Sequence, residues 1–265
     1  MPIAALQLID LYYEVRGRGQ KLLFISGTGG DLRVRPNVFD GPLPAHFQVL
    51  SYDQRGLGQS AKPTTEYQMA DYAEDSAALL DHLQWPAVTV VGVSFGGMVA
   101  QELALRYPQK IQRLALCCTS SGGVGGASFP LHELADLEPG DRAARHLAQS
   151  DLRRDAAWQA ANPERWQKLL DMALGATRAD RDAAGASRQL AARAGHDTWN
   201  RLPQLDLPVL VMGGRYDGVA PVANQEALAS QIVNAELRLY EGGHLFLAQD
   251  KSAYPDLVSW LSAPS

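Results

Sequence analysis

The 265-residue sequence predicts an α/β fold in which a parallel sheet has its strands joined by crossover helices. Short β-branched runs alternate with longer stretches whose apolar residues recur at helical spacing. The composition is 46% hydrophobic and 20% charged, as in globular proteins with a sizeable core, and no segment approaches the roughly 18 apolar residues of a membrane span. Disordered, collagen-like and membrane-spanning classes are therefore excluded.

The first elements differ in character from the rest of the chain. Residues 6–8 and 11–15 alternate between apolar and polar side chains, and Gly17 and Gly19 follow as turn residues. This pattern predicts an antiparallel start to the sheet, ahead of its parallel part.

Four buried parallel strands are expected next, at residues 21–26, 47–53, 87–92 and 111–118. Between the second and third strands, apolar and small residues over 69–83 recur at helical spacing and form one packing face. Between the third and fourth, the pattern over 96–107 is helical and stops at Pro108. We interpret the adjacent Cys117 and Cys118 as small buried strand residues, not as metal ligands or a disulfide.

The pattern changes between residues 122 and 200, where no strand-like run occurs and Ala, Arg and Asp are frequent. Strand signals return at two places, residues 207–212 and 235–240. Two more helical patterns close the far edge, at residues 221–232 and 253–261. We interpret residues 122–200 as a helical cap inserted into one core, formed by residues 1–121 and 201–265.

The charge balance bears on possible partners. The chain has 29 acidic and 24 basic residues and a net charge of −5, so no basic field attracts nucleic acid or an anionic membrane. The N-terminus has no basic stretch followed by an apolar run, which favours a cytoplasmic protein or a chain from which a leader was removed. The sequence gives no indication of the oligomeric state.

A G-x-S-x-G pattern, Gly92 to Gly96, lies between a predicted strand and a predicted helix. Ser94 would then lie at a tight, strained turn, with its hydroxyl exposed at the carboxyl edge of the sheet. The helix that follows favours negative charge, so the N–H of Phe95 is expected to be one oxyanion donor. The alternative is a glycine-rich turn without chemistry.

A serine nucleophile needs a base, and histidine is the usual one. Of the six histidines, His244 directly follows a late strand in a glycine-bearing loop, so it should emerge at the same edge as Ser94. His82 lies within a helix and His46 at the opposite end of a strand. The other three lie in the cap, at His132, His146 and His196.

The acid that orients the base is expected after another strand at this edge. Asp217 follows the strand at 207–212, although an aspartate here could instead cap the next helix. Asp250 and Asp256 are less plausible because they follow His244 within the closing helical region. The resulting chain order is serine, acid, histidine.

A glycine-rich loop, residues 26–30, follows the first central strand. Its glycines would let the backbone approach a substrate carbonyl, so the second oxyanion donor is expected here. A simple turn or a phosphate cradle are the alternatives, but the lysine of a phosphate-binding P-loop does not follow.

Over nearly its whole length the chain resembles the α/β-hydrolase superfamily. The resemblance rests on five landmarks in order: residues 26–30, residues 51–60, the Ser94 turn, the Asp217 loop and the Gly-Gly-His244 loop. It implies a mostly parallel eight-stranded sheet flanked by helices, and it is strongest toward 3-oxoadipate enol-lactonases and small carboxylesterases. It also places the loop's oxyanion donor at Thr28, while Ser26 stands where the family usually has histidine. The glycines and Arg55 of residues 53–60 are taken as structural.

The resemblance and the motifs together predict a serine hydrolase that cleaves a carboxylic ester or lactone through an acyl-enzyme, with no cofactor and no metal. Val219 and Leu245, beside the predicted triad, are expected to contact substrate. Because the cap has few obvious charged anchors, a small and mostly apolar substrate is expected. Epoxide or haloalkane chemistry would need an aspartate at position 94. A small-molecule receptor that keeps the triad, or an acyltransferase, are the alternatives.

Overall fold

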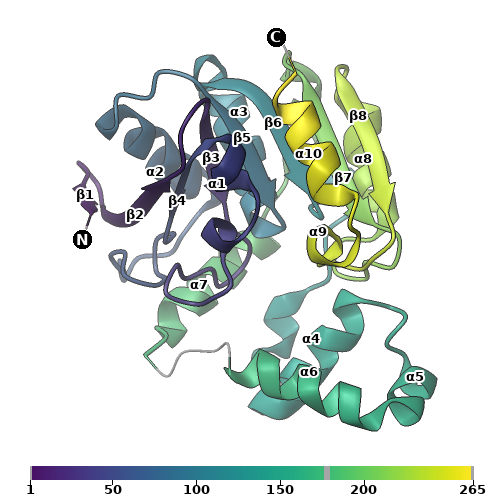
Figure 1. The fold of residues 1–265 in the computed structure, drawn as a ribbon. Coiled ribbons are helices and arrows are strands. Elements are labelled where there is room, and N and C mark those ends of the chain that lie inside the picture. The colour runs from purple at the N-terminus through teal and green to yellow at the C-terminus, as the bar shows by residue number, and fades with distance from the viewer. Residues whose placement is uncertain (1, 176–179, 264–265) are drawn as a thin grey trace.

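The computed structural model describes residues 2–175 and 180–263. In these ranges one eight-stranded sheet has the order β1-β2-β4-β3-β5-β6-β7-β8 (Figure 1). Its strands are β1 Ile3–Ala5, β2 Asp10–Arg16, β3 Lys21–Ile25, β4 Gln48–Tyr52, β5 Val88–Val93, β6 Ile111–Cys117, β7 Val209–Gly214 and β8 Ala235–Tyr240. β1 and β2 pair antiparallel, β2 pairs antiparallel with β4, and the pairs from β4 to β8 are parallel. The predicted α/β fold class is confirmed.

The first strand is not where the sequence pattern placed it. Residues 6–8 do not form a strand, because Leu6 N–H donates to Ile9 O and closes a turn between β1 and β2. Leu8, at 65% exposure, points to solvent at this turn. Alternating side chains over three residues do not distinguish a strand from a turn, so the pairing of Ile3–Ala5 with Asp10–Tyr12 decided the outcome.

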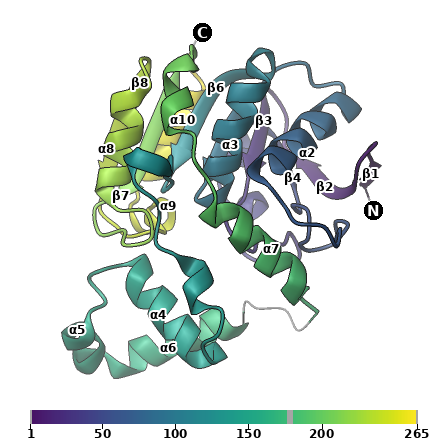
Figure 2. The ribbon, with the colours of Figure 1, turned by 180° about the vertical axis from the view of Figure 1, so that it is seen from behind.

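Helices cover both faces of the sheet. The helices of the described ranges are α1 Leu43–His46, α2 Met69–His82, α3 Phe95–Arg106, α4 Pro139–Ser150, α5 Ala156–Ala161, α6 Pro163–Gly175, α7 Ala183–Ala194, α8 Val222–Gln231, α9 Phe246–Gln249 and α10 Ala253–Leu261. Side chains of α2, α3 and α8 fill the core on one face, and those of α1, α9 and α10 fill it on the other (Figures 1 and 2). Neighbouring strand residues alternate between the two cores, as Val90 and Val91 do. No helix in the described part of the chain combines the length and apolarity needed to cross a membrane.

The helices between β6 and β7 fall into two groups. α4, α5 and α6 pack on one another below the carboxyl edge of the sheet, whereas α7 runs back along the core (Figure 2). The two ends of this segment meet at a bridge between Gly122 and Asp197. The division into a core and a cap of residues 122–200 stays a prediction.

A buried ion pair attaches the segment that follows β4 to helix α2. The Nε and Nη2 atoms of Arg55 each donate to an Asp75 carboxylate oxygen at 2.7 Å, and the two side chains are 9% and 1% exposed. Asp75→Asn leaves this buried guanidinium without its main counter-charge and is expected to lower the free energy of unfolding by about 3 kcal/mol. Urea unfolding measures it, with Glu74→Gln, an exposed neighbour, as the control. A loss below about 1 kcal/mol would contradict the role of the pair.

His196 makes the stability of the fold depend on pH. Burial lowers its pKa to about 4 in the fold, so the unfolded chain binds more protons below the ordinary histidine pKa of 6.5. Stability from this group is present at pH 7 and is lost as the pH falls from about 6.5 to about 4. We expect the free energy of unfolding to fall about 2 kcal/mol more between pH 7 and pH 5 in the wild type than in His196→Asn. An unchanged slope would refute this, and the exposed His82→Asn serves as the control.

Candidate active site

The turn between β5 and α3 holds Ser94 in a strained conformation, with φ of 55° and ψ of −118°. A Cβ on Gly92 would lie 2.4 Å from Gly96 O, and a Cβ on Gly96 would lie 2.1 Å from Ile25 O. Only glycine permits these two approaches between strand, turn and helix. The strain therefore holds the serine at the carboxyl edge of the sheet, as the motif predicted.

Ser94, His244 and Asp217 meet in one chain of hydrogen bonds. Nε2 of His244 is 2.9 Å from Ser94 Oγ, and Nδ1 is 2.8 Å from Asp217 Oδ2. The other oxygen of Asp217 accepts the N–H groups of Val219 and Ala220 at 2.8 and 2.9 Å. Asp217 thus organises its own loop and the histidine at once. With the Nδ1 proton directed at Asp217, Nε2 is free to accept the serine proton.

The end of α4 lies against the loops of both the acid and the base. His244 N–H donates to Ser150 O at 2.6 Å, and Gly218 N–H donates to Gln149 O at 3.1 Å. Leu152 N–H reaches back to Tyr216 O at 2.9 Å. Sequence reasoning missed these contacts, because they are made by backbone groups that no residue type announces.

The two predicted oxyanion donors flank the serine. A Cβ on Gly27 would lie 3.4 Å from Ser94 Cβ, so the loop after β3 lies directly against the nucleophile. Within the described residues, neither Thr28 N–H nor Phe95 N–H donates to a protein acceptor. Both are therefore available to a substrate oxygen, and their assignment stays a proposal.

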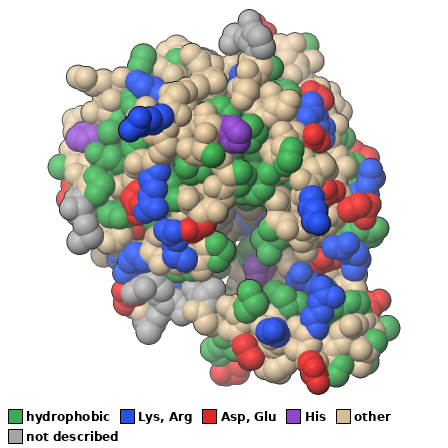
Figure 3. All heavy atoms as spheres, in the orientation of Figure 1, with side chains coloured by type: hydrophobic (Ala, Val, Ile, Leu, Met, Phe, Trp, Pro, Cys, Tyr) green, Lys and Arg blue, Asp and Glu red, His purple; other side chains and the backbone are tan. Residues whose placement is uncertain are grey.

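A cavity of about 470 Å³ opens beside His244, between the loop after β3 and helices α4 and α6. Figure 3 shows a hollow between the body of the molecule and the group of helices below it, with a histidine side chain inside the hollow. Thr28, His244 and Leu245 line the cavity, whereas the wholly buried Val219 does not. Of the two predicted substrate contacts, the structure thus places Leu245 alone at the cavity.

Comparison with known proteins identifies the family. The model of a family described as alpha/beta hydrolase fold matches residues 21–251, which is most of the chain. The chain belongs to the α/β-hydrolase fold family. The predicted superfamily membership is thereby confirmed.

Three similar proteins narrow the activity class of this α/β hydrolase. A poly(3-hydroxyalkanoate) depolymerase from Ectopseudomonas oleovorans is 30% identical, covering 89% of this chain and 82% of that protein. The 3-oxoadipate enol-lactonase 2 of Acinetobacter baylyi is 29% identical, with coverages of 95% and 92%. The crystal structure of the enol-lactonase from Burkholderia xenovorans LB400 superposes with a TM-score of 0.78 at 25% identity, covering 98% of this chain and 99% of that one. The comparisons support hydrolysis as the activity class.

The cavity of this α/β hydrolase is lined by both apolar and charged side chains. One wall is apolar, and it consists of Leu147, Leu169, Met172, Ala173 and Leu245. Asp31 of the core and Arg154 and Arg181 of the predicted cap also line the cavity, so charged side chains border a lining that is mostly apolar. Asp31, Arg154 and Arg181 are each more than 25 residues apart in the chain, so no local sequence pattern indicates that they share a cavity.

His146, on α4, is a cavity residue that sequence reasoning set aside. It lines the same cavity as His244. Burial lowers the pKa of His146, and the nearby His244 and Arg193 lower it further, so its imidazole is neutral at neutral pH. His146 and Ser150 are four residues apart and so lie on one face of the helix. The sequence does not show which part of the protein that face packs against.

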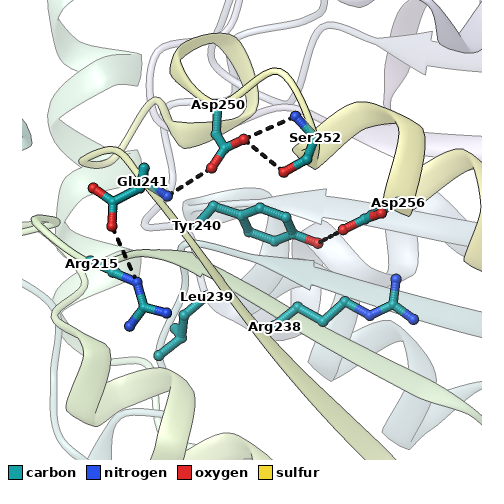
Figure 4. A pocket seen from close by; sticks show the side chains of 8 residues that line it. All are labelled: Arg215, Arg238, Leu239, Tyr240, Glu241, Asp250, Ser252 and Asp256. Carbon is teal, nitrogen blue, oxygen red and sulfur yellow. Dashed lines mark hydrogen bonds and ion pairs between the residues drawn. The ribbon is translucent and has the colours of Figure 1, made fainter.

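A second cavity of about 450 Å³ lies beside β8 (Figure 4). Its polar groups already pair with one another: Tyr240 donates to Asp256, Glu241 N–H donates to Asp250, and Arg215 faces Glu241 at 3.4 Å. It holds no serine–histidine pair. The cavity lined by His244 is therefore the stronger candidate for a catalytic site.

One group of side chains has the residue types of a metal site. Ligand atoms of Cys118, Asp217 and His244 lie within 4.8 Å of one another. Burial, with the Asp217 charge second, raises the pKa of the Cys118 thiol well above its usual range, so the protonated thiol is a poor metal ligand. Asp217 and His244 already bind each other. The group fits a proton relay better than a metal site.

Proposed function

We propose that this hydrolase cleaves a small carboxylic ester or lactone through an acyl-enzyme formed on Ser94. The single observation that carries the proposal is the continuous chain from Asp217 through His244 to Ser94, whose histidine lines a substrate-sized cavity. A serine hydroxyl becomes nucleophilic when such a base accepts its proton.

In the acylation half, Ser94 Oγ bonds to the substrate carbonyl carbon while its proton passes to His244 Nε2. The carbonyl oxygen becomes an oxyanion, to which the N–H groups of Thr28 and Phe95 donate. The carbon–oxygen bond to the leaving alcohol then breaks, and His244 returns its proton to that oxygen. Asp217 stabilises the transient imidazolium.

In the deacylation half, water attacks the acyl carbon and gives a proton to His244. The bond to Ser94 breaks, the serine oxygen recovers that proton, and a carboxylic acid leaves. With a lactone the released hydroxyl stays on the acyl chain, so ring opening and hydrolysis yield one hydroxy acid.

Two features support an ester or lactone as substrate. A relative covering nearly the whole chain is named an enol-lactonase. The cavity combines an apolar wall with charged side chains, which suits a molecule that has an apolar part and a polar group. The substrate is therefore proposed to be amphipathic.

A panel of p-nitrophenyl esters and lactones, with and without a serine-directed phosphonate, tests the proposal. We expect multiple turnovers, loss of activity at one phosphonate per chain, and the adduct on Ser94 by mass spectrometry. A single turnover without recovery would indicate a receptor, and a new ester formed with added alcohol in preference to the acid would indicate an acyltransferase. Either result, or an adduct elsewhere, would overturn the proposal.

A further inference from the structure

The loop that carries Thr28 has little structure of its own. It contains Gly27, Gly29 and Gly30, and its internal backbone bond among the described residues runs from Gly30 N–H to Gly27 O at 3.2 Å. Gly29 has a φ of +75°, a conformation that side chains rarely adopt. A segment with three glycines in four residues has many alternative conformations, so something outside the loop must select the catalytic one.

Two buried glutamines from distant parts of the chain close a circuit around Thr28. Gly29 N–H donates to Gln189 Oε1 at 2.8 Å, Gln189 Nε2 donates to Gln54 Oε1 at 3.2 Å, and Gln54 Nε2 donates to Ser26 O at 2.7 Å. Both glutamine side chains belong to residues with 0% exposure. The circuit binds the loop on each side of Thr28.

The hydrogen-bond roles in this circuit are determined from its ends. Gly29 N–H can only donate, so it requires the oxygen of Gln189, and Ser26 O can only accept, so it requires the amide NH₂ of Gln54. The two remaining amide groups then face each other as donor and acceptor. Reversing either amide would place two donors or two acceptors together, so the circuit has one consistent arrangement.

The elements that carry the glutamines are themselves fixed. A Cβ on Gly185 of α7 would lie 2.1 Å from Gly56 O, so helix and loop backbones are in contact one turn before Gln189. Asp53, beside Gln54, accepts Leu32 N–H at 2.7 Å and holds the far end of the same loop. The circuit therefore joins α7 to the oxyanion loop through rigid supports.

From these contacts we propose that Gln189 and Gln54 are positioning residues that hold the Thr28 N–H toward the reacting carbonyl oxygen. The proposal rests on the proposed ester or lactone hydrolysis. Ser26 in place of the family's usual histidine accords with it, because the glutamines make the bonds that fix the loop. Neither glutamine touches the substrate in this role.

Gln189→Met tests the proposal, since methionine retains the length of the side chain and removes both hydrogen bonds. We expect kcat for the best panel ester to fall by about tenfold to a hundredfold, somewhat less than the loss of an oxyanion donor. KM should stay within about threefold, because the donor acts mainly on the transition state. Gln54→Met should behave alike, and the double variant should lose little more than either single one, because both break one circuit.

Gln101→Met is the matched control. Gln101 is also a wholly buried glutamine whose amide is hydrogen-bonded, donating to Gly97 O and Ser120 O and accepting from Thr198, but it does not contact the loop. It should lower the melting temperature while leaving kcat within about threefold at temperatures where all variants are folded. A kcat loss in Gln189→Met no larger than in this control would overturn the proposal.

Hydrogen exchange of a peptide spanning residues 26–31 gives a readout that does not depend on activity. Exchange should be faster in Gln189→Met than in the wild type and in Gln101→Met, because the Gly29 N–H loses its acceptor. Unchanged exchange would refute the positioning role. If the wild type itself shows no Ser94-dependent hydrolysis, the proposed function fails; if it hydrolyses and the glutamine variants match it, this inference alone fails.

Discussion

Ser94→Ala is expected to lower kcat for ester hydrolysis by about 10⁴-fold to 10⁶-fold, the largest effect of any single substitution in this chain. The methyl group cannot form the acyl-enzyme, so the oxyanion donors and substrate binding would be left to act on a water attack alone. His244 Nε2 would lose its partner at 2.9 Å. The variant should neither release a burst of p-nitrophenol nor take up the phosphonate.

The fold should tolerate this change, because alanine fits the same tight turn and the Gly92 and Gly96 contacts remain. Thermal unfolding and circular dichroism check that the lost activity is chemical. Ser76→Ala is the matched control: Ser76 lies on α2, away from the cavity, and its buried hydroxyl bonds Tyr52 at the end of β4, so the variant should retain kcat. Retention of more than about 1% of wild-type kcat by Ser94→Ala would contradict the nucleophile assignment.

Asp217→Asn is expected to lower kcat by about 10⁴-fold while KM changes little. The reason lies in which atoms the side chain binds. The backbone N–H groups of Val219 and Ala220 require an acceptor, so the amide oxygen must stay with them and the NH₂ group must face His244. Nδ1 of His244 would then have to accept, its proton would move to Nε2, and Nε2 could no longer accept from Ser94.

This prediction is checked by kcat and KM at several pH values, together with thermal unfolding. Asp256→Asn is the control, because Asp256 accepts from Tyr240 beside the other cavity and follows His244 in the chain. It should keep kcat within about threefold. Equal losses in the two variants would mean that the effect comes from stability, and a fully active Asp217→Asn would remove Asp217 from the relay.

The sheet and the nucleophile turn could be predicted because their signals are local. The strand at residues 235–240 was predicted with the bounds that β8 has, and the serine turn follows from two glycines at fixed spacing. Local signals also have limits. Residues 6–8 alternate between apolar and polar side chains as a strand would, yet the turn closed by Leu6 and Ile9 makes them a connection.

The cavity lining could not be predicted in the same way. His146 was set aside because it lies in the inserted segment, and that segment folds back so that α4 faces His244. The charged residues that line the cavity, Arg154 among them, have no sequence pattern that marks them as neighbours. Helical periodicity shows which residues share a face, but it does not show what that face packs against.

The amino-acid sequence alone predicted the alternation of central strands and helices, the strained serine turn and loops that bring His244 and Asp217 to one edge, because each follows from backbone sterics and from the shared carboxyl edge of parallel strands. The tertiary structure alone decided which groups surround that edge. Gln189 reaches Gly29 across 160 residues, and the end of α4 reaches the His244 loop. Such contacts arise when whole helices and strands pack together. The free energy of that packing is distributed over many apolar side chains, so the residues that come into contact carry no local sequence signal.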